Sequence, residues 1–175
     1  LTPRVKYPAG ARTLFARGSK APLNWTIGLP MMKVDEETWT LTVPAPVEDF
    51  EWKPLLDDAT WAKGPNYNGR LDAGNEIAPH FFRDTGEWTI RWPLFASAVL
   101  GNTRGVYVYL PPTYLENGAS RLPVVYMHDG QNLFDPNTSF VRGQHWRLGE
   151  MADMLIAEGR VQPLLIVGVN HTGIG

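Results

Sequence analysis

Short alternating segments fill the first part of the chain, residues 1–82, where Gly, Pro and Asn repeatedly interrupt the pattern. In Thr38–Val43 the apolar positions, Trp39 among them, alternate with three threonines, which predicts a half-buried strand. Phe50 and Trp52 alternate with charged residues in the same way. Because no window has helical periodicity, residues 1–82 are predicted to form a β-sandwich, with these tryptophans in its core.

The pattern changes from Asp84 onward. Apolar and polar residues alternate over 88–92 and again over 106–110, which predicts two paired strands. The run Val124–Met127 is instead continuously apolar. A continuous run suits a strand that is covered on both faces, as in a parallel sheet.

A helix and a further strand are predicted after this run. Apolar residues recur at the i, i+3, i+4 and i+7 spacing of an amphipathic helix, at Leu148, Met151, Ala152 and Leu155. Gly159 and Pro163 end that helix, and Leu164–Val169 is apolar enough for a second buried strand. We expect Leu164–Val169 to leave an unpaired parallel edge, which further structure must cover.

The turn His128–Gly130 follows directly after the continuous apolar run. Open α/β sheets bind ligands at the carboxyl ends of their strands, so this polar, glycine-containing turn is a candidate site. An ordinary strand-to-loop transition is the alternative. Adjacent side chains of an extended segment point to opposite faces, so His128 and Asp129 are not expected to form a catalytic pair, and Asp129 is predicted to shape the turn.

The charge balance and the lengths of the apolar runs limit the partners that we expect for this chain. Lys and Arg total 16 against 18 Asp and Glu, with the signs interspersed, so neither a nucleic acid nor an anionic membrane is expected as a partner. No apolar run approaches the roughly 18 residues of a spanning helix, and no signal-like segment follows Leu1. The compartment stays open: a leader removed before Leu1 would give a secreted or periplasmic location.

The chain has 0 cysteines, which rules out disulfides, thiol catalysis and zinc–thiolate sites. Its 4 histidines lack the spacing of a metal site, so we expect no metal and no cofactor. With 43% hydrophobic residues the chain is typical of globular proteins, and 175 residues fit one domain or two.

Residues 124–136 (VVYMHDGQNLFDP) closely resemble the putative esterase family of α/β-hydrolases, which includes esterase D, feruloyl esterases, enterochelin esterases and mycolyltransferases. The resemblance continues through 138–140, Trp146, 156–159 and 166–169. It implies serine-dependent ester hydrolysis with a G-x-S-x-G motif, an acid and a histidine. None of the 4 serines has glycine two positions before and two after. The resemblance therefore implies that the catalytic serine, acid and histidine lie outside this chain.

One catalytic part is implied at Gln131, the residue after the strand-end Asp129–Gly130 pair. In the family, the residue at this position contributes its backbone N–H to the oxyanion hole. Acyl transfer develops negative charge on the carbonyl oxygen, and a fixed N–H aimed at that oxygen stabilises the transition state.

A second resemblance involves two tryptophans in turn-rich surroundings, Trp25 and Trp61. Together with FEWK at 50–53 and WAKGPN at 61–66, they resemble the starch-binding modules of amylolytic enzymes. The resemblance implies that Trp25 and Trp61 stack on sugar rings while Lys53 and Asn66 bond to hydroxyl groups. The chain has Trp52 in place of the usual tyrosine and no clear tyrosines for a second glycan site. A sandwich that only packs on the hydrolase and binds nothing remains the alternative.

The combined prediction is a multidomain chain. An immunoglobulin-like β-sandwich of the carbohydrate-binding-module type covers 1–82, and the first half of an α/β-hydrolase covers 84–175. The predicted function is carboxylic ester hydrolysis once the remainder of the hydrolase domain is present, with this chain inactive alone. Its expected partners are an ester substrate, that remainder and an α-glucan. A non-catalytic module that binds starch- or glycogen-type α-glucan is the alternative function.

Overall fold

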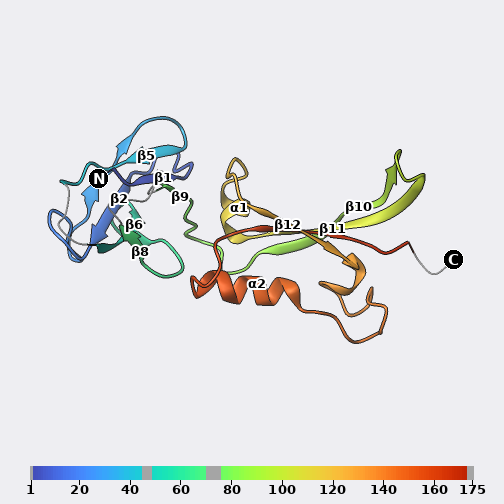
Figure 1. The fold of residues 1–175 in the computed structure, drawn as a ribbon. Helices are drawn as coiled ribbons and strands as arrows, with labels where there is room; N and C mark the ends of the chain where they lie inside the picture. The colour runs from blue at the N-terminus through green and yellow to red at the C-terminus, as the bar shows by residue number, and fades with distance from the viewer. Residues whose placement is uncertain (1, 45–48, 70–75, 173–175) are drawn as a thin grey trace. The chain divides into compact units, whose positions relative to one another are not determined.

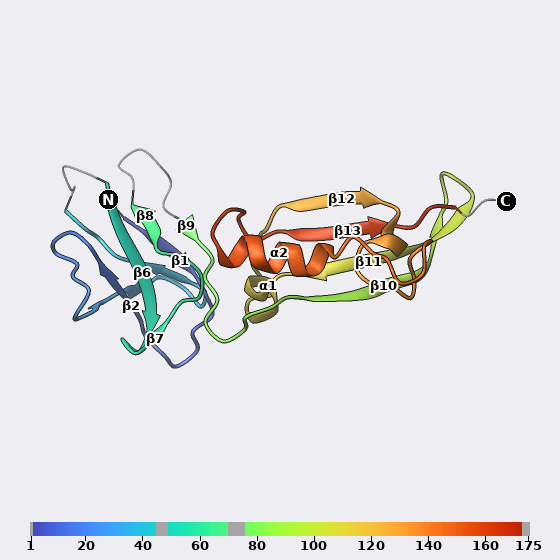
Figure 2. The same cartoon turned by 90° about the horizontal axis from the view of Figure 1, so that it is seen from below.

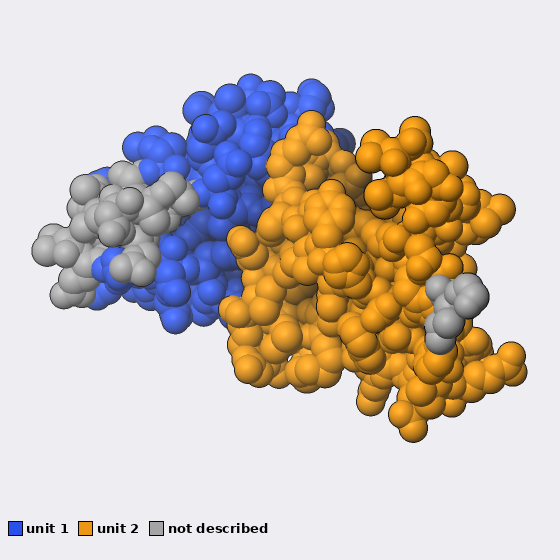
Figure 3. All heavy atoms as spheres, turned by 45° about the vertical axis from the view of Figure 1, so that its right-hand side comes forward, with its two compact units in different colours: residues 1–82 blue, residues 83–175 orange. Residues whose placement is uncertain are grey.

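The computed structural model describes residues 2–44, 49–69 and 76–172. The chain divides into two compact units, Leu1–Phe82 and Arg83–Gly175, which Figure 3 colours blue and orange. Regular structure is mostly β, with three sheets and few helices. Among the described residues, no helix combines the length and the apolar character needed to cross a membrane.

Two sheets make up the first unit. The first contains, in spatial order, β4 (Met32–Lys33), β5 (Thr38–Thr40), β1 (Arg4–Lys6) and β9 (Glu76–Ile77). The second contains β3 (Leu29–Pro30), β2 (Leu14–Gly18), β6 (Phe50–Leu56) and β7 (Thr60–Trp61), and β8 (Tyr67–Gly69) also pairs with β6. Both sheets contribute side chains to one hydrophobic core, so the unit is a β-sandwich.

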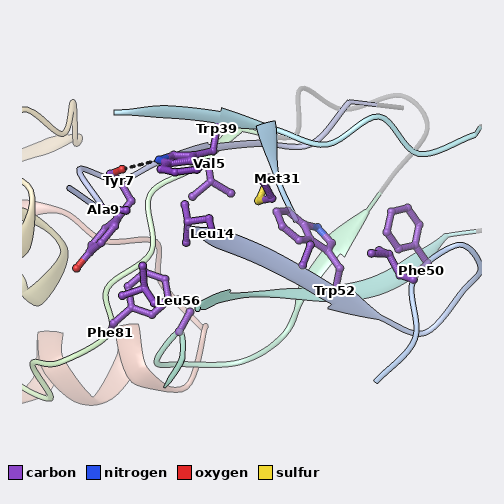
Figure 4. Close-up of a cluster of buried hydrophobic side chains, with 13 residues drawn as sticks. Val5, Tyr7, Ala9, Leu14, Met31, Trp39, Phe50, Trp52, Leu56 and Phe81 are labelled. Atoms are coloured by element: carbon purple, nitrogen blue, oxygen red, sulfur yellow. Dashed lines mark hydrogen bonds between the residues drawn. The ribbon is translucent and has the colours of Figure 1, made fainter. Parts of the chain in front are cut away.

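The core of the sandwich forms from the alternating apolar positions (Figure 4). Trp52 is 1% exposed, and Trp39 is buried with its indole Nε1 donating to the carbonyl of Tyr7 at 3.0 Å, so the prediction that both are core residues is confirmed. The strand at Thr38 is shorter than predicted, and Thr38 is buried instead of facing outward. Burial is tolerated because its hydroxyl accepts a hydrogen bond from Lys6 Nζ at 2.6 Å.

The second unit contains a single sheet in the described part of the chain. Figure 2 shows its strands side by side, in the order β10 (Glu87–Ser97), β11 (Asn102–Leu110), β13 (Leu165–Val169) and β12 (Val124–His128). β10 pairs antiparallel with β11, which confirms the predicted pair of leading strands, and β12 runs parallel to β13. The helical segments are α1 (Pro112–Glu116), the 3₁₀ turn η1 (Gly130–Asn132) and α2 (Leu148–Ala157).

Helix α2 lies against one face of this sheet (Figure 1). Its stripe packs through Leu148 and Ala152 on a core that includes Tyr107, Tyr109, Leu133, Phe134 and Ile166, which confirms the predicted amphipathic helix. The hydroxyl of Tyr109 donates to Asp153 Oδ1 at 2.6 Å and ties the helix to β11. Burial, reinforced by this carboxylate, raises the pKa of Tyr109 far above its ordinary value.

Two predictions about the sheet are wrong. Val124–Met127 was expected to be covered on both faces, but within the described residues β12 is an edge strand, and Tyr126 is 75% exposed. The unpaired edge was expected at Leu164–Val169, yet β13 lies between β11 and β12. Both segments are continuous apolar runs, so their sequence patterns could not show which of the two lies at the edge of the sheet. Strand order is decided by pairing with β11.

Candidate functional site

The outward face of the second sandwich sheet carries the residues of the first candidate site. Trp61 on β7 lies opposite Leu55 of β6, and Arg17 on β2 lies opposite Lys53 of β6. Side chains of directly paired residues share a face, and alternation along β6 keeps Lys53 and Leu55 on the same side. Trp61, Arg17 and Lys53 therefore project from one face, away from buried Trp52.

The two predicted stacking tryptophans meet on this face. Trp25 is 39% exposed and Trp61 38%, with ring centroids 6.2 Å apart and ring planes inclined by 41°. Trp25 lies in a loop that is held by Asn24, whose Oδ1 accepts hydrogen bonds from the backbone N–H groups of Thr26 and Ile27, each at 2.8 Å. We call Trp25, Trp61, Lys53 and Asn66 the aromatic site.

The two predicted hydrogen-bonding residues already have protein partners. Lys53 Nζ donates to the carbonyl of Gly64, and Asn66 Nδ2 donates to Glu51 Oε2 at 3.0 Å. Burial lowers the pKa of Lys53 below its ordinary value. An ammonium has three donors and a carboxamide has two donors and an acceptor, so both groups keep capacity for a ligand hydroxyl.

Arg17 was not identified from the sequence, although it contacts both tryptophans on this face. Its guanidinium carbon is 5.3 Å from the ring centroid of Trp61, and its Nη1 donates to the carbonyl of Trp25 at 3.3 Å. Its Nε bonds to Asp58 Oδ1 at 2.8 Å. The alternation of Leu14–Gly18, which directs Arg17 away from the core, was the available signal.

The second candidate site is the loop after β12. Asp129 adopts a left-handed conformation (φ 57°, ψ 43°), which confirms its predicted role in the turn. The next residue, Gly130, approaches β13 so closely that a Cβ atom there would lie 2.7 Å from the carbonyl oxygen of Gly168. Only glycine fits this contact, because the neighbouring atoms belong to the backbone. The contact holds η1 against the carboxyl end of β13.

Gln131, predicted to supply an oxyanion-hole N–H, is the middle residue of η1 and is 8% exposed. Its carbonyl accepts from Thr138 Oγ1 at 2.8 Å, and its side-chain Oε1 accepts from the backbone N–H of His171 at 3.3 Å. Among the described residues, its backbone N–H has no acceptor and its buried Nε2 has no partner. The N–H needed for an oxyanion is thus uncommitted within the described chain.

The two candidate sites differ in their chemistry. The aromatic site offers apolar ring faces beside polar donors, which suits a sugar. The loop at Gln131 offers a backbone donor at the carboxyl edge of parallel strands, and the sequence contains no G-x-S-x-G motif. The described chain has no group of three or more His, Cys, Asp or Glu residues arranged to hold a metal ion.

Comparison with known proteins gives one family match. Residues 97–174 match the model of the family described as "Putative esterase". None of the curated proteins is significantly similar to the chain.

Several solved structures are similar to this chain, and two of them are esterases. One is a ferulic acid esterase, at 22% identity over 49% of this chain and 30% of that chain, with a TM-score of 0.37. Another is the enterobactin esterase from Shigella flexneri, solved in the presence of 2,3-di-hydroxy-N-benzoyl-glycine, at 11% identity over 97% of this chain and 50% of that chain, with a TM-score of 0.32. The chain therefore spans half or less of the length of either structure.

Proposed function

We propose that residues 84–175 are the first part of a serine-dependent carboxylic ester hydrolase of the α/β-hydrolase fold. The esterase match over 97–174 supports this proposal at the level of the family. The catalytic serine, acid and histidine lie outside the 175 residues, in agreement with the absence of a G-x-S-x-G motif from the sequence.

The observation that carries the proposal is the hydrogen bonding of Gln131. An oxyanion donor must be fixed in place and must not be consumed by a protein acceptor. The close contact between Gly130 and Gly168 fixes the turn, and the hydrogen bonds to the Gln131 carbonyl and to its side-chain Oε1 hold the residue on its main chain and on its side chain. Its N–H has no acceptor among the described residues. The second oxyanion donor comes from the remainder of the domain.

The free edge of β12 supports a missing remainder. Val124, Val125 and Tyr126 are exposed, and the edge offers unpaired backbone groups to another strand. A parallel sheet is normally covered on both faces, and an open apolar edge leads to aggregation. The remainder of the hydrolase domain pairs with β12 and covers these side chains.

The test is a fluorophosphonate probe applied to the intact protein that contains these residues, followed by peptide mapping. Intact mass is measured first, against 19.6 kDa for this chain. We expect hydrolysis of a simple aryl ester and a single labelled serine outside residues 1–175. Labelling of Ser120 or Ser139, or neither labelling nor hydrolysis, would overturn the proposal.

A second function is favoured by the aromatic site: binding of an α-glucan by the β-sandwich. Sugar rings have an apolar CH face and a rim of hydroxyl groups, so indoles cover the face and nearby polar groups bond to the rim. The 41° inclination of Trp25 and Trp61 suits consecutive rings of a curved chain, as in starch-type glucans. Lys53 and Asn66 supply the polar groups.

Calorimetry with maltoheptaose tests this second function on the whole chain. We expect weak binding that Trp61→Ala weakens by about tenfold or more, because loss of a central aromatic contact removes a large share of binding energy. Trp92→Ala is the matched control, since Trp92 is also exposed but lies on β10. Equal affinities for wild type and Trp61→Ala, or no binding by the wild type, would reject α-glucan binding at this site.

A further inference from the structure

We propose that Arg17, anchored by Asp58, is the positioning residue of the aromatic site: it sets the distance and the inclination between Trp25 and Trp61. This inference rests on the glycan-binding function proposed above for its consequence in affinity. The effect of Arg17 on the arrangement of the two tryptophans can be measured without any glycan.

Arg17 contacts both tryptophans at once. One guanidinium nitrogen donates to the carbonyl of Trp25 at 3.3 Å, and the guanidinium carbon lies 5.3 Å from the ring centroid of Trp61. The first contact is with the backbone of the Trp25 loop, and the second is a cation–π interaction with the ring of Trp61. The guanidinium is planar and rigid, so the two contacts link the backbone of Trp25 to the ring of Trp61 in one arrangement.

Asp58 holds the guanidinium of Arg17 in place through two hydrogen bonds. Its Oδ1 accepts from Arg17 Nε at 2.8 Å, and its carbonyl accepts from Arg17 Nη2 at 3.1 Å. Its second carboxylate oxygen accepts from the backbone N–H of Gly28 at 3.1 Å, at the far end of the Trp25 loop. Asp58 therefore connects the β6–β7 hairpin, which carries Trp61, to the loop that carries Trp25.

The residues around the Arg17–Asp58 pair are closely packed. Asp58 has a left-handed backbone (φ 52°), a conformation that non-glycine residues adopt mainly where their contacts hold them. A Cβ atom on Gly28 would lie 2.2 Å from Asp58 Oδ1, so the loop approaches the carboxylate without spare room. The Arg17 side chain is only 16% exposed, whereas Trp25 is 39% and Trp61 38% exposed, so the tryptophans and not the arginine are the open surface.

An affinity consequence follows from pre-organisation. Two indoles that are already held in the bound geometry lose less side-chain freedom on binding than two mobile ones. Without the guanidinium, Trp61 loses its cation–π partner, and the Trp25 loop loses the hydrogen bond to the Trp25 carbonyl. We expect Arg17→Met, which keeps a stem of similar length, to weaken binding of maltoheptaose by about tenfold through this loss of order.

The experiment compares wild type, Arg17→Met, Asp58→Asn and Arg12→Met in the whole chain, with Trp25→Phe and Trp61→Ala as reference variants. Asparagine tolerates the left-handed backbone of residue 58 while removing the charge. Arg12 is a matched control, because it also pairs with an aspartate and lies 5.3 Å from an aromatic centroid, but at Asp57 and Phe82. The first readout is the far-UV circular dichroism couplet from coupled indoles, assigned by its loss in Trp25→Phe, and the second is calorimetry with maltoheptaose.

We expect Arg17→Met to lose the couplet and most of the affinity while its melting curve shows a folded protein at the assay temperature. Asp58→Asn should lose part of both, and Arg12→Met should keep both. A merely structural role of Arg17 would lower the melting temperature and leave the couplet of the folded protein intact, and that result would overturn the inference. If Trp61→Ala abolishes binding but Arg17→Met does not, glycan binding stands and the inference fails. If the wild type binds no glycan, the couplet alone decides the role of Arg17.

Discussion

The two units expose different amounts of apolar surface. In the first unit, both sheets bury their inward faces in a common core that includes Trp39, Trp52 and Leu56, and two exposed tryptophans, Trp25 and Trp61, are contacted by Arg17. In the described part of the second unit, the buried cluster is smaller, and exposed apolar side chains follow β10 and β12. Large exposed apolar patches are typical of interaction surfaces.

The same contrast applies to the two candidate sites. In the aromatic site, two exposed indoles lie beside polar side chains. At Gln131, a backbone N–H has no acceptor among the described residues, and the sequence has no G-x-S-x-G motif. The proposed glycan binding is therefore measured on this chain, and the proposed ester hydrolysis on the intact protein that contains these residues.

The largest expected effect is on the core of the first unit. Trp52→Ala should destabilise that unit by about 3–5 kcal/mol, because it removes a fully buried indole and leaves a cavity. Trp92→Ala in the second unit should change the free energy of unfolding by less than about 1 kcal/mol, because Trp92 is exposed. Urea unfolding monitored by circular dichroism measures both. Similar losses in the two variants would remove the contrast between the units.

The next effect concerns Gln131 in the completed enzyme. Gln131→Pro deletes the backbone donor and should reduce turnover of an aryl ester by about a hundred- to a thousandfold. Gln131→Ala keeps the N–H but loses the bond from His171 N to Oε1, so its loss should be less than about tenfold. Thermal melting of both variants controls for folding, since proline also restrains its neighbours. A loss in the alanine variant that equals the loss in the proline variant would assign the function to the side chain.

A smaller effect is expected at the edge strand. The isolated chain should self-associate through β12, and Tyr126→Lys should shift it toward monomer, because a charged side chain on an edge strand disfavours pairing with another copy. Light scattering after size-exclusion chromatography measures the change. Lys33→Glu on β4 of the first unit is the control, and it should leave the association unchanged. A wild-type chain that is already monomeric at high concentration would contradict an exposed edge.

The smallest effect is a pH dependence of the aromatic site. The hydrogen bond from Arg17, followed by the Gly28 N–H, holds the pKa of Asp58 below its ordinary value of 3.8. The folded state favours the carboxylate, so the stabilisation is fully present above pH 3.8 and is lost as the pH falls through the lower, folded pKa. Titration of the indole couplet should therefore show a loss below pH 3.8 that Asp58→Asn lacks. A transition near neutral pH would point to another group.

Local patterns predicted individual elements well. The stripe of Leu148, Met151, Ala152 and Leu155 led to α2, and the alternation around Trp39 and Trp52 led to two core tryptophans. These predictions succeeded because amphipathic periodicity is a property of neighbouring residues. Arg17 was missed because its importance comes from Trp25, Trp61 and Asp58, which are distant in sequence and meet only after the strands pair.

The amino-acid sequence by itself determined which segments are strands or helix, where the chain turns at Asp129, and which tryptophans stand in turn-rich surroundings. The tertiary structure alone decided that β13 is central while β12 is the edge, that Gly130 touches Gly168, and that one guanidinium contacts both platforms of the aromatic site. The physical reason is the range of the interactions. Periodicity and turn preference act between near neighbours, whereas strand order and side-chain clamps depend on pairing between residues that are far apart in the chain.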